Sequence, residues 1–112
     1  MDYKIVVFVP DAHLEPVKQA LFTAGAGGFD RYDQCSWQVG GQGQFRPIGA
    51  ANPHTGQLDK LTVACEWRLE LVVTQTCLKA AVAAMLKAHP YEEVAFEVYE
   101  LVDRQQFLNI EV

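Results

Sequence analysis

Two short stretches of this sequence hold most of the residue types that could do chemistry. The first is residues 40–56, GGQGQFRPIGAANPHTG, which contains five glycines and two prolines. Glycine and proline at this density exclude a helix or a central strand, and long loops in compact domains are commonly functional. A simple linker would not need an aromatic ring, a guanidinium and an imidazole, so we predict a ligand-binding or interface loop. Its candidate residues are Gly43, Phe45, Arg46, Asn52 and His54.

The second stretch is HPYEE, residues 89–93, whose His89, Glu92 and Glu93 are potential ligands of a divalent metal. No pair of ligands here has the spacing of a zinc site within one element. The alternative is structural. His89 would then cap the last carbonyls of a helix, and the glutamates would face solvent or accept hydrogen bonds from backbone amides. The structural interpretation is favoured, although subunits of an assembly could bring ligands together.

Residues in and just before the first stretch also suggest two other chemistries, phosphate binding and nucleophilic catalysis. The amides of GGQGQF followed by Arg46 could hold an anion, but the P-loop lysine is missing. Cys35 and Ser36 have no histidine near them in sequence to act as a base, and Cys35 alternates with Trp37 as core residues do. We therefore predict no catalytic residues.

The composition limits the function further. A chain of 112 residues, half of them apolar, predicts one domain with a small core. The net charge of −5 argues against nucleic-acid binding, no apolar stretch could span a membrane, and residues 1–4 lack the features of a signal peptide. We expect a cytoplasmic protein. Cys35, Cys65 and Cys77 form no CxxC pair, so free thiols packed as small hydrophobic side chains are expected.

Hydrophobic periodicity predicts the elements that must position these residues. Residues 3–9 are apolar and β-branched, which indicates a central strand ended by Pro10. A helix follows Asp11, and Gly25 should end it as a left-handed cap. Its apolar stripe is Leu14, Val17, Leu21 and Ala24. Residues 29–39 form a second strand, with Cys35, Trp37 and Val39 on its buried face.

The second half of the chain repeats the pattern. Residues 61–73 alternate strictly and predict a strand of roughly 40 Å with Trp67 on its apolar face, long enough to project toward a partner subunit. A helix capped by Thr74 or Thr76 and ended by Pro90 comes next, and residues 94–101 form the last strand. The buried stripe of this second helix is Leu78, Val82 and Met85, widened by Ala81 and Leu86. Residues 45–48 are a candidate short edge strand.

The order β-α-β-β-α-β predicts an α+β, ferredoxin-like sandwich: an antiparallel sheet in strand order 4-1-3-2 with two helices on one face. The single domain covers residues 1–102. Residues 103–112 are a tail whose Phe107, Leu108 and Ile110 add an edge strand or dock on a neighbouring subunit. The other sheet face, with Glu66, Arg68 and Glu70, lacks helices, and another subunit commonly covers such a face.

The motifs YDQCSW, GQFRP, NPHTG and HPYEE, in this order, resemble the CutA-like, PII-like domain of the YqfO family in its stand-alone form. The resemblance covers residues 3–101 and implies a ferredoxin-like homotrimer built like those of CutA and PII proteins. The dinuclear metal site of the long YqfO proteins lies in their other domain, so their GTP cyclohydrolase label is not implied for this chain. Phe29-Asp30-Arg31 departs from the glycine-containing turn with Asn that the resemblance leads one to expect.

The sequence is compatible with three functions. The first is a non-catalytic regulatory or ligand-sensing trimer with sites at subunit interfaces. The second is a divalent-metal-binding protein resembling CutA, which makes a divalent metal the candidate cofactor. The third is an enzyme acting on a small phosphorylated molecule. In the trimer, we expect Arg46 of one subunit to lie near Glu92 or Glu93 of another.

Overall fold

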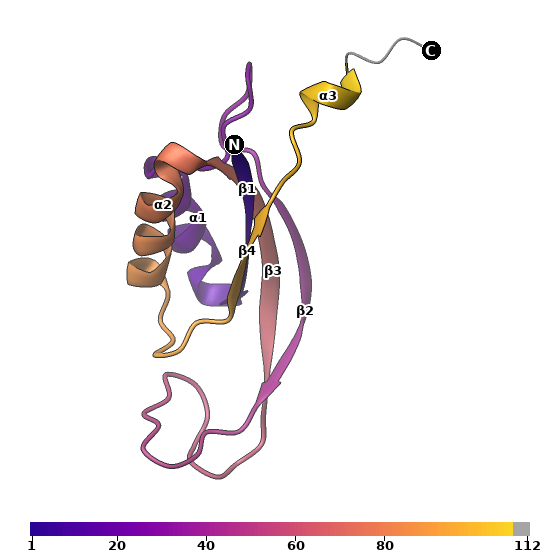
Figure 1. Ribbon diagram of the computed structural model, residues 1–112. Coiled ribbons are helices and arrows are strands. Elements are labelled where there is room, and N and C mark those ends of the chain that lie inside the picture. The colour runs from indigo at the N-terminus through magenta and orange to yellow at the C-terminus, as the bar shows by residue number, and fades with distance from the viewer. Residues whose placement is uncertain (109–112) are drawn as a thin grey trace.

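Four antiparallel strands form one sheet in the order β2-β3-β1-β4 (Figure 1). The computed structural model describes residues 1–108. Its strands are β1 (Asp2–Pro10), β2 (Trp37–Phe45), β3 (Thr62–Thr74) and β4 (Phe96–Glu100). The central strands β1 and β3 pair over the whole of β1, from Asp2 opposite Thr74 to Pro10 opposite Glu66. The predicted fold class and strand order are confirmed.

Two helices cover one face of the sheet (Figure 1). A single turn of 3-10 helix, η1 (Asp11–His13), leads from β1 into α1 (Leu14–Thr23), and α2 (Gln75–Ala88) follows β3. The core lies between the helices and the sheet. It includes Ile5, Val7, Val9, Val17, Leu21, Leu69, Ala81 and Met85, all of them fully buried. The predicted stripe of the first helix is confirmed for Leu14, Val17 and Leu21, and Gly25 has the expected positive φ of 101°.

The long strand β3 has the two faces that its alternation predicts. Leu69, Leu71 and Val73 are buried under the helices. Trp67 lies on the same face but is only partly buried, and its Nε1–H donates a hydrogen bond to Asp11 Oδ1 at 2.6 Å. The residues before Cys65 extend beyond the helices, so Val63 is 56% exposed. We call the face without helices the open face.

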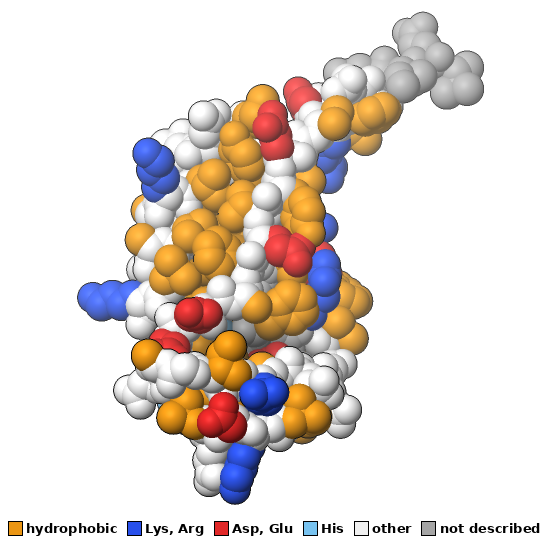
Figure 2. Space-filling view, turned by 60° about the horizontal axis from the view of Figure 1, so that its bottom comes forward, with side chains coloured by type: hydrophobic (Ala, Val, Ile, Leu, Met, Phe, Trp, Pro, Cys, Tyr) orange, Lys and Arg blue, Asp and Glu red, His pale blue; other side chains and the backbone are white. Residues whose placement is uncertain are grey.

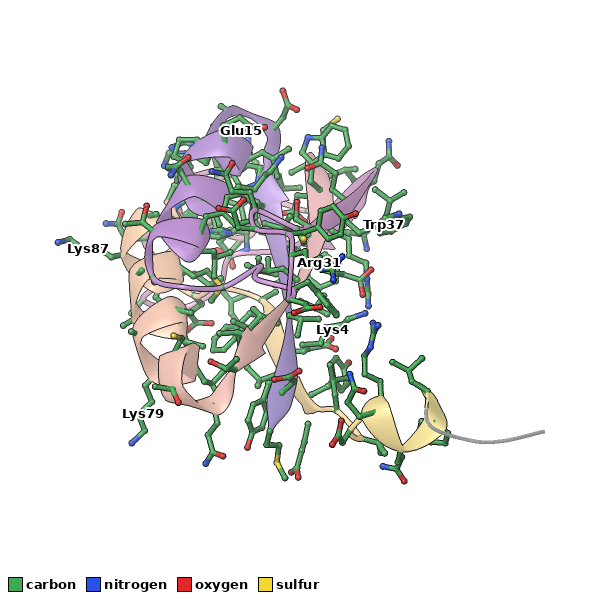
Figure 3. The ribbon with its side chains drawn as sticks, turned by 90° about the horizontal axis from the view of Figure 1, so that it is seen from above. Lys4, Glu15, Arg31, Trp37, Lys79 and Lys87 are labelled. Carbon is green, nitrogen blue, oxygen red and sulfur yellow. The ribbon has the colours of Figure 1, made fainter. Side chains whose placement is uncertain are left out.

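The prediction for β2 was wrong in its bounds and in its faces. The strand begins at Trp37 and runs through Gly40, Gly41 and Gly43 to Phe45, because an edge strand tolerates residues without side chains. Trp37 pairs with Glu70 and therefore lies on the open face, 60% exposed and away from the helices (Figure 3). Gln38 lies on the helix side instead, where it accepts a hydrogen bond from Lys18.

Several smaller expectations also need correction. In residues 45–48, only Phe45 belongs to a strand. Leu86 was expected in the buried stripe of α2 but is 41% exposed. Cys65 is exposed rather than packed in the core. The tail forms a short helix, α3 (Gln105–Leu108), that projects from the sheet rather than adding a strand (Figure 1). The remainder of the tail, including Ile110, lies outside the described residues. Within residues 1–108, no helix is long and apolar enough to cross a membrane.

Candidate functional site

The two stretches that the sequence singles out meet at one end of the molecule. The loop between β2 and β3 folds back beneath the sheet and approaches the connection between α2 and β4 (Figure 1). Together with the end of the open face they line a cavity of about 640 Å³ that opens to solvent. The cavity is lined by Gly43, Phe45, Arg46, Glu92 and Glu93, five of the eight candidate residues. Figure 2 shows this end of the molecule, where hydrophobic side chains lie among charged ones.

One hydrogen bond joins the two stretches directly within a single chain. The backbone N–H of Asn52 donates to Glu92 Oε1 at 2.8 Å. The two stretches therefore already meet within one subunit. Arg46 forms an ion pair with Asp59 across 3.8 Å, and both side chains are largely exposed. An exposed pair of this kind contributes little to stability. Arg46 also lines the cavity, where its guanidinium is a positive charge.

Tyr91 lies at the centre of the site, although it is not among the candidate residues selected from the sequence. Its hydroxyl donates to Glu66 Oε2 at 2.9 Å, and its ring centroid lies 6.1 Å from that of Phe45 and 6.2 Å from that of His54. Burial and the hydrogen bond to Glu66 raise the pKa of Tyr91 to about 12. The phenol therefore stays protonated at neutral pH and remains a hydrogen-bond donor.

His89 holds the end of α2 against β1. Its Nε2–H donates to the Phe8 carbonyl oxygen at 2.7 Å, and its Nδ1 accepts the backbone N–H of Tyr91 at 3.1 Å. This pattern requires the neutral imidazole, because one nitrogen donates and the other accepts. Burial lowers the pKa of His89 below its ordinary value of 6.5. Both ring nitrogens are thus occupied, and neither is free to bind a metal.

The other two histidines lie beside each other. The rings of His13 and His54 meet edge to face at a centroid distance of 5.5 Å. The Nδ1 atom of His13 is buried and has no hydrogen-bond partner among residues 1–108. In the part of the chain that the structure describes, no group of three or more His, Cys, Asp or Glu side chains is placed to hold a metal ion.

Known proteins resemble this chain both in sequence and in fold. No protein-family model matches the chain. A GTP cyclohydrolase 1 type 2 homolog of Halalkalibacterium halodurans is 40% identical over 108 residues, which are 96% of this chain and 29% of that protein. The crystal structure of a Bacillus cereus protein related to NIF3 matches with a TM-score of 0.77 and 37% identity, over 91% of this chain and 26% of that one.

A PII-like protein CutA from Nostoc sp. PCC 7120 matches 93% of this chain and 84% of its own with a TM-score of 0.64. At 15% identity this likeness shows the fold alone. The cyclohydrolase homologs and the NIF3-related protein, in contrast, share sequence with this chain, which spans somewhat more than a quarter of their length.

Proposed function

We propose that this chain, which is homologous to about a quarter of the length of the GTP cyclohydrolase 1 type 2 homologs and has the CutA-like fold, is a small-molecule-binding regulatory domain. In this proposal it works as a homotrimer of the CutA/PII-like type and has no catalytic activity of its own. The predicted division into a domain of residues 1–102 and a tail belongs to the same proposal, as does a cytoplasmic location.

The cavity at the loop end carries this proposal. Its volume of about 640 Å³ lies within the range of small-molecule sites, and apolar walls with a few polar groups are typical of such sites. The polar groups include Glu66, Glu92 and Arg46. Trimer formation would place further residues at its mouth if the open face is covered by a neighbour.

The cyclohydrolase activity named in the relatives is not part of the proposal, because this chain spans only about a quarter of their length. A metal site formed by His89, Glu92 and Glu93 receives no support from the geometry, since both His89 nitrogens are bonded to backbone groups. An enzyme for a phosphorylated substrate is disfavoured by the carboxylates in the cavity, which repel phosphate.

A thermal-shift screen of the full chain tests the proposal. A ligand that binds only the native state raises the melting temperature, because the stabilisation grows as the logarithm of 1 + [L]/Kd. The screen covers nucleotides, divalent metals, amines, amino acids and carboxylates. We expect at least one organic compound to raise the melting temperature of the wild type and to have no effect on Tyr91→Ala, which lacks the central ring of the cavity.

The control variant is Leu86→Ala, because Leu86 lies on the exposed side of α2 and not in the cavity. It should respond to the ligand as the wild type does. Stabilisation by metals alone would favour the CutA-like metal alternative, and turnover of a nucleotide would favour the enzyme. If no compound of any class stabilises the wild type, the proposed function is wrong.

A further inference from the structure

Aromatic rings form much of the apolar lining of the cavity. Phe8, Phe45 and Tyr91 all line it, together with Ile48 and Pro53. The rings of Phe45 and Tyr91 are inclined to each other by 57°, so they form a concave wall rather than a stack. The ring of Phe8 already attracts one cation of this chain, because the Arg68 guanidinium carbon lies 5.6 Å from its centroid. Arg68 itself does not line the cavity.

The charges that line the cavity are mainly negative. Three carboxylates, those of Glu66, Glu92 and Glu93, face one guanidinium, that of Arg46. Arg46 is paired with Asp59. Among residues 1–108, none of the three cavity glutamates has a salt-bridge partner. By contrast, Glu70 on the same face of β3 is paired with Lys4 and Arg68.

Glu66 is held in place by its neighbours. Tyr91 donates a hydrogen bond to Oε2, and Oε1 lies directly over Gly43, so that a Cβ atom at position 43 would overlap it. Gly43 has no positive φ, and its backbone would accept alanine. The absence of a side chain at this position is therefore explained by the space that the Glu66 carboxylate occupies. A partly buried carboxylate beside aromatic rings is a site for a cationic group.

From these contacts we infer that the cavity binds a small organic cation, whose ammonium or guanidinium group pairs with Glu66 and whose apolar part lies against Phe45 and Tyr91. The inference rests on the proposed function and adds the chemical class of the ligand. A phosphorylated ligand would instead place its charge beside three carboxylates, which is unfavourable.

Three probes of nearly identical shape test the sign of the charge: benzylammonium, benzyl alcohol and benzoate. Each is titrated into ¹⁵N-labelled wild-type protein at neutral pH, and the amide shifts of Gly43, Tyr91 and Glu92 report binding in the cavity. A charge-assisted hydrogen bond is worth about 1.5–3 kcal/mol, which corresponds to at least a tenfold effect on affinity. We therefore expect benzylammonium to bind at least tenfold more tightly than benzyl alcohol and benzoate to bind least.

Two matched pairs of variants assign the effect to Glu66. Glu66→Gln keeps the shape and can still accept the Tyr91 hydrogen bond, but should lower benzylammonium affinity about tenfold and leave benzyl alcohol affinity unchanged. Glu70→Gln removes a carboxylate from the same face outside the cavity and should change neither. Gly43→Ala should displace the Glu66 carboxylate and weaken cation binding, whereas Gly41→Ala, with open space at its Cβ, should not.

The inference is overturned if benzyl alcohol or benzoate binds as tightly as benzylammonium, or if Glu70→Gln lowers cation affinity as much as Glu66→Gln does. The proposed function survives either result, because a neutral or anionic ligand would still occupy the cavity. Absence of shifts at the cavity amides with all three probes also overturns the inference. The thermal-shift screen then decides separately whether the cavity binds a ligand of another class.

Discussion

His89 combines burial with two obligatory hydrogen bonds, and its environment determines how stability responds to pH. Only 6% of the residue is exposed. Burial is the main cause of its lowered pKa, which the charges of His13 and His54 lower further; the hydrogen bond to Phe8 and the charge of Glu66 act in the opposite direction. Protonation would turn Nδ1 into a donor facing the N–H of Tyr91, so the charged form is incompatible with the native contacts.

The first prediction follows from this lowered pKa. The unfolded chain takes up a proton at His89 near pH 6.5, whereas the folded chain does so only at lower pH. The contribution of His89 is therefore fully present above pH 6.5 and is lost as the pH falls through the folded-state pKa. In urea denaturation, the free energy of unfolding of the wild type should decrease over this range, and His89→Gln should show a smaller decrease. NMR titration of the His89 ring should give a midpoint below 6.5; a midpoint at or above that value would contradict the prediction.

Among single residues, the sequence motifs select several that line the cavity but miss the contact between Tyr91 and Glu66. Five of the eight candidate residues line the cavity. They could be selected from the sequence because glycine, arginine and glutamate in short motifs are residue types typical of binding sites. Tyr91 and Glu66 could not be found in this way. They are 25 positions apart, and their contact depends on how the α2–β4 connection crosses the end of β3. Spacing within one element carries no information about that crossing.

At the scale of elements, β3 and β2 show where periodicity succeeds and where it fails. The alternation of β3 predicts its buried half, because Leu69, Leu71 and Val73 lie under the helices. Trp37 and Val39 alternate equally well but face the open side. Alternation identifies two faces of a strand but does not indicate which face the helices cover. In the structure, Trp37 pairs with Glu70 and therefore lies on the face without helices. The glycines of β2 were mistaken for a loop for a related reason, since an exposed edge strand needs few side chains.

The turn after α1 provides the second prediction, because Gly25 in this turn lies against Cys77 of α2. Gly25 has a φ of 101°, and a Cβ atom there would lie 2.8 Å from Cys77 Sγ on α2. Gly25→Ala should lower the free energy of unfolding by about 1–3 kcal/mol, through backbone strain and displacement of the Cys77 side chain. Urea denaturation monitored by circular dichroism measures this.

Gly28 is the matched control, since it lies just after the same turn, has no positive φ and has open space at its Cβ. Gly28→Ala should change stability by no more than about 0.5 kcal/mol. Equal effects of the two substitutions would mean that the α1–α2 contact at Cys77 is not tight.

At the scale of the whole molecule, the shape is more extended than a chain of this length requires. The radius of gyration is 16.2 Å, whereas a compact domain of about 100 residues has a value of about 13 Å. The β2–β3 hairpin and the projecting α3 account for the elongation (Figure 1). In the described residues no helix covers the open face, where Trp37 is 60% and Val39 is 43% exposed. An exposed apolar surface rimmed by charges is typical of an interaction site.

The last prediction concerns assembly through this face. If the open face forms the trimer contacts, light scattering at micromolar concentration should give three times the mass of one chain. Trp37→Glu should reduce this to the monomer mass, because an unpaired charge would be buried at the interface. The substitution should leave the circular dichroism spectrum unchanged, since Trp37 is largely exposed in a single chain.

Leu86→Glu is the control: Leu86 is also exposed but lies on α2, in the helix layer on the opposite side of the sheet, so this variant should remain trimeric. A wild-type protein with the mass of one chain would rule out the trimer, and loss of the trimer in Leu86→Glu alone would move the interface from the sheet to the helices.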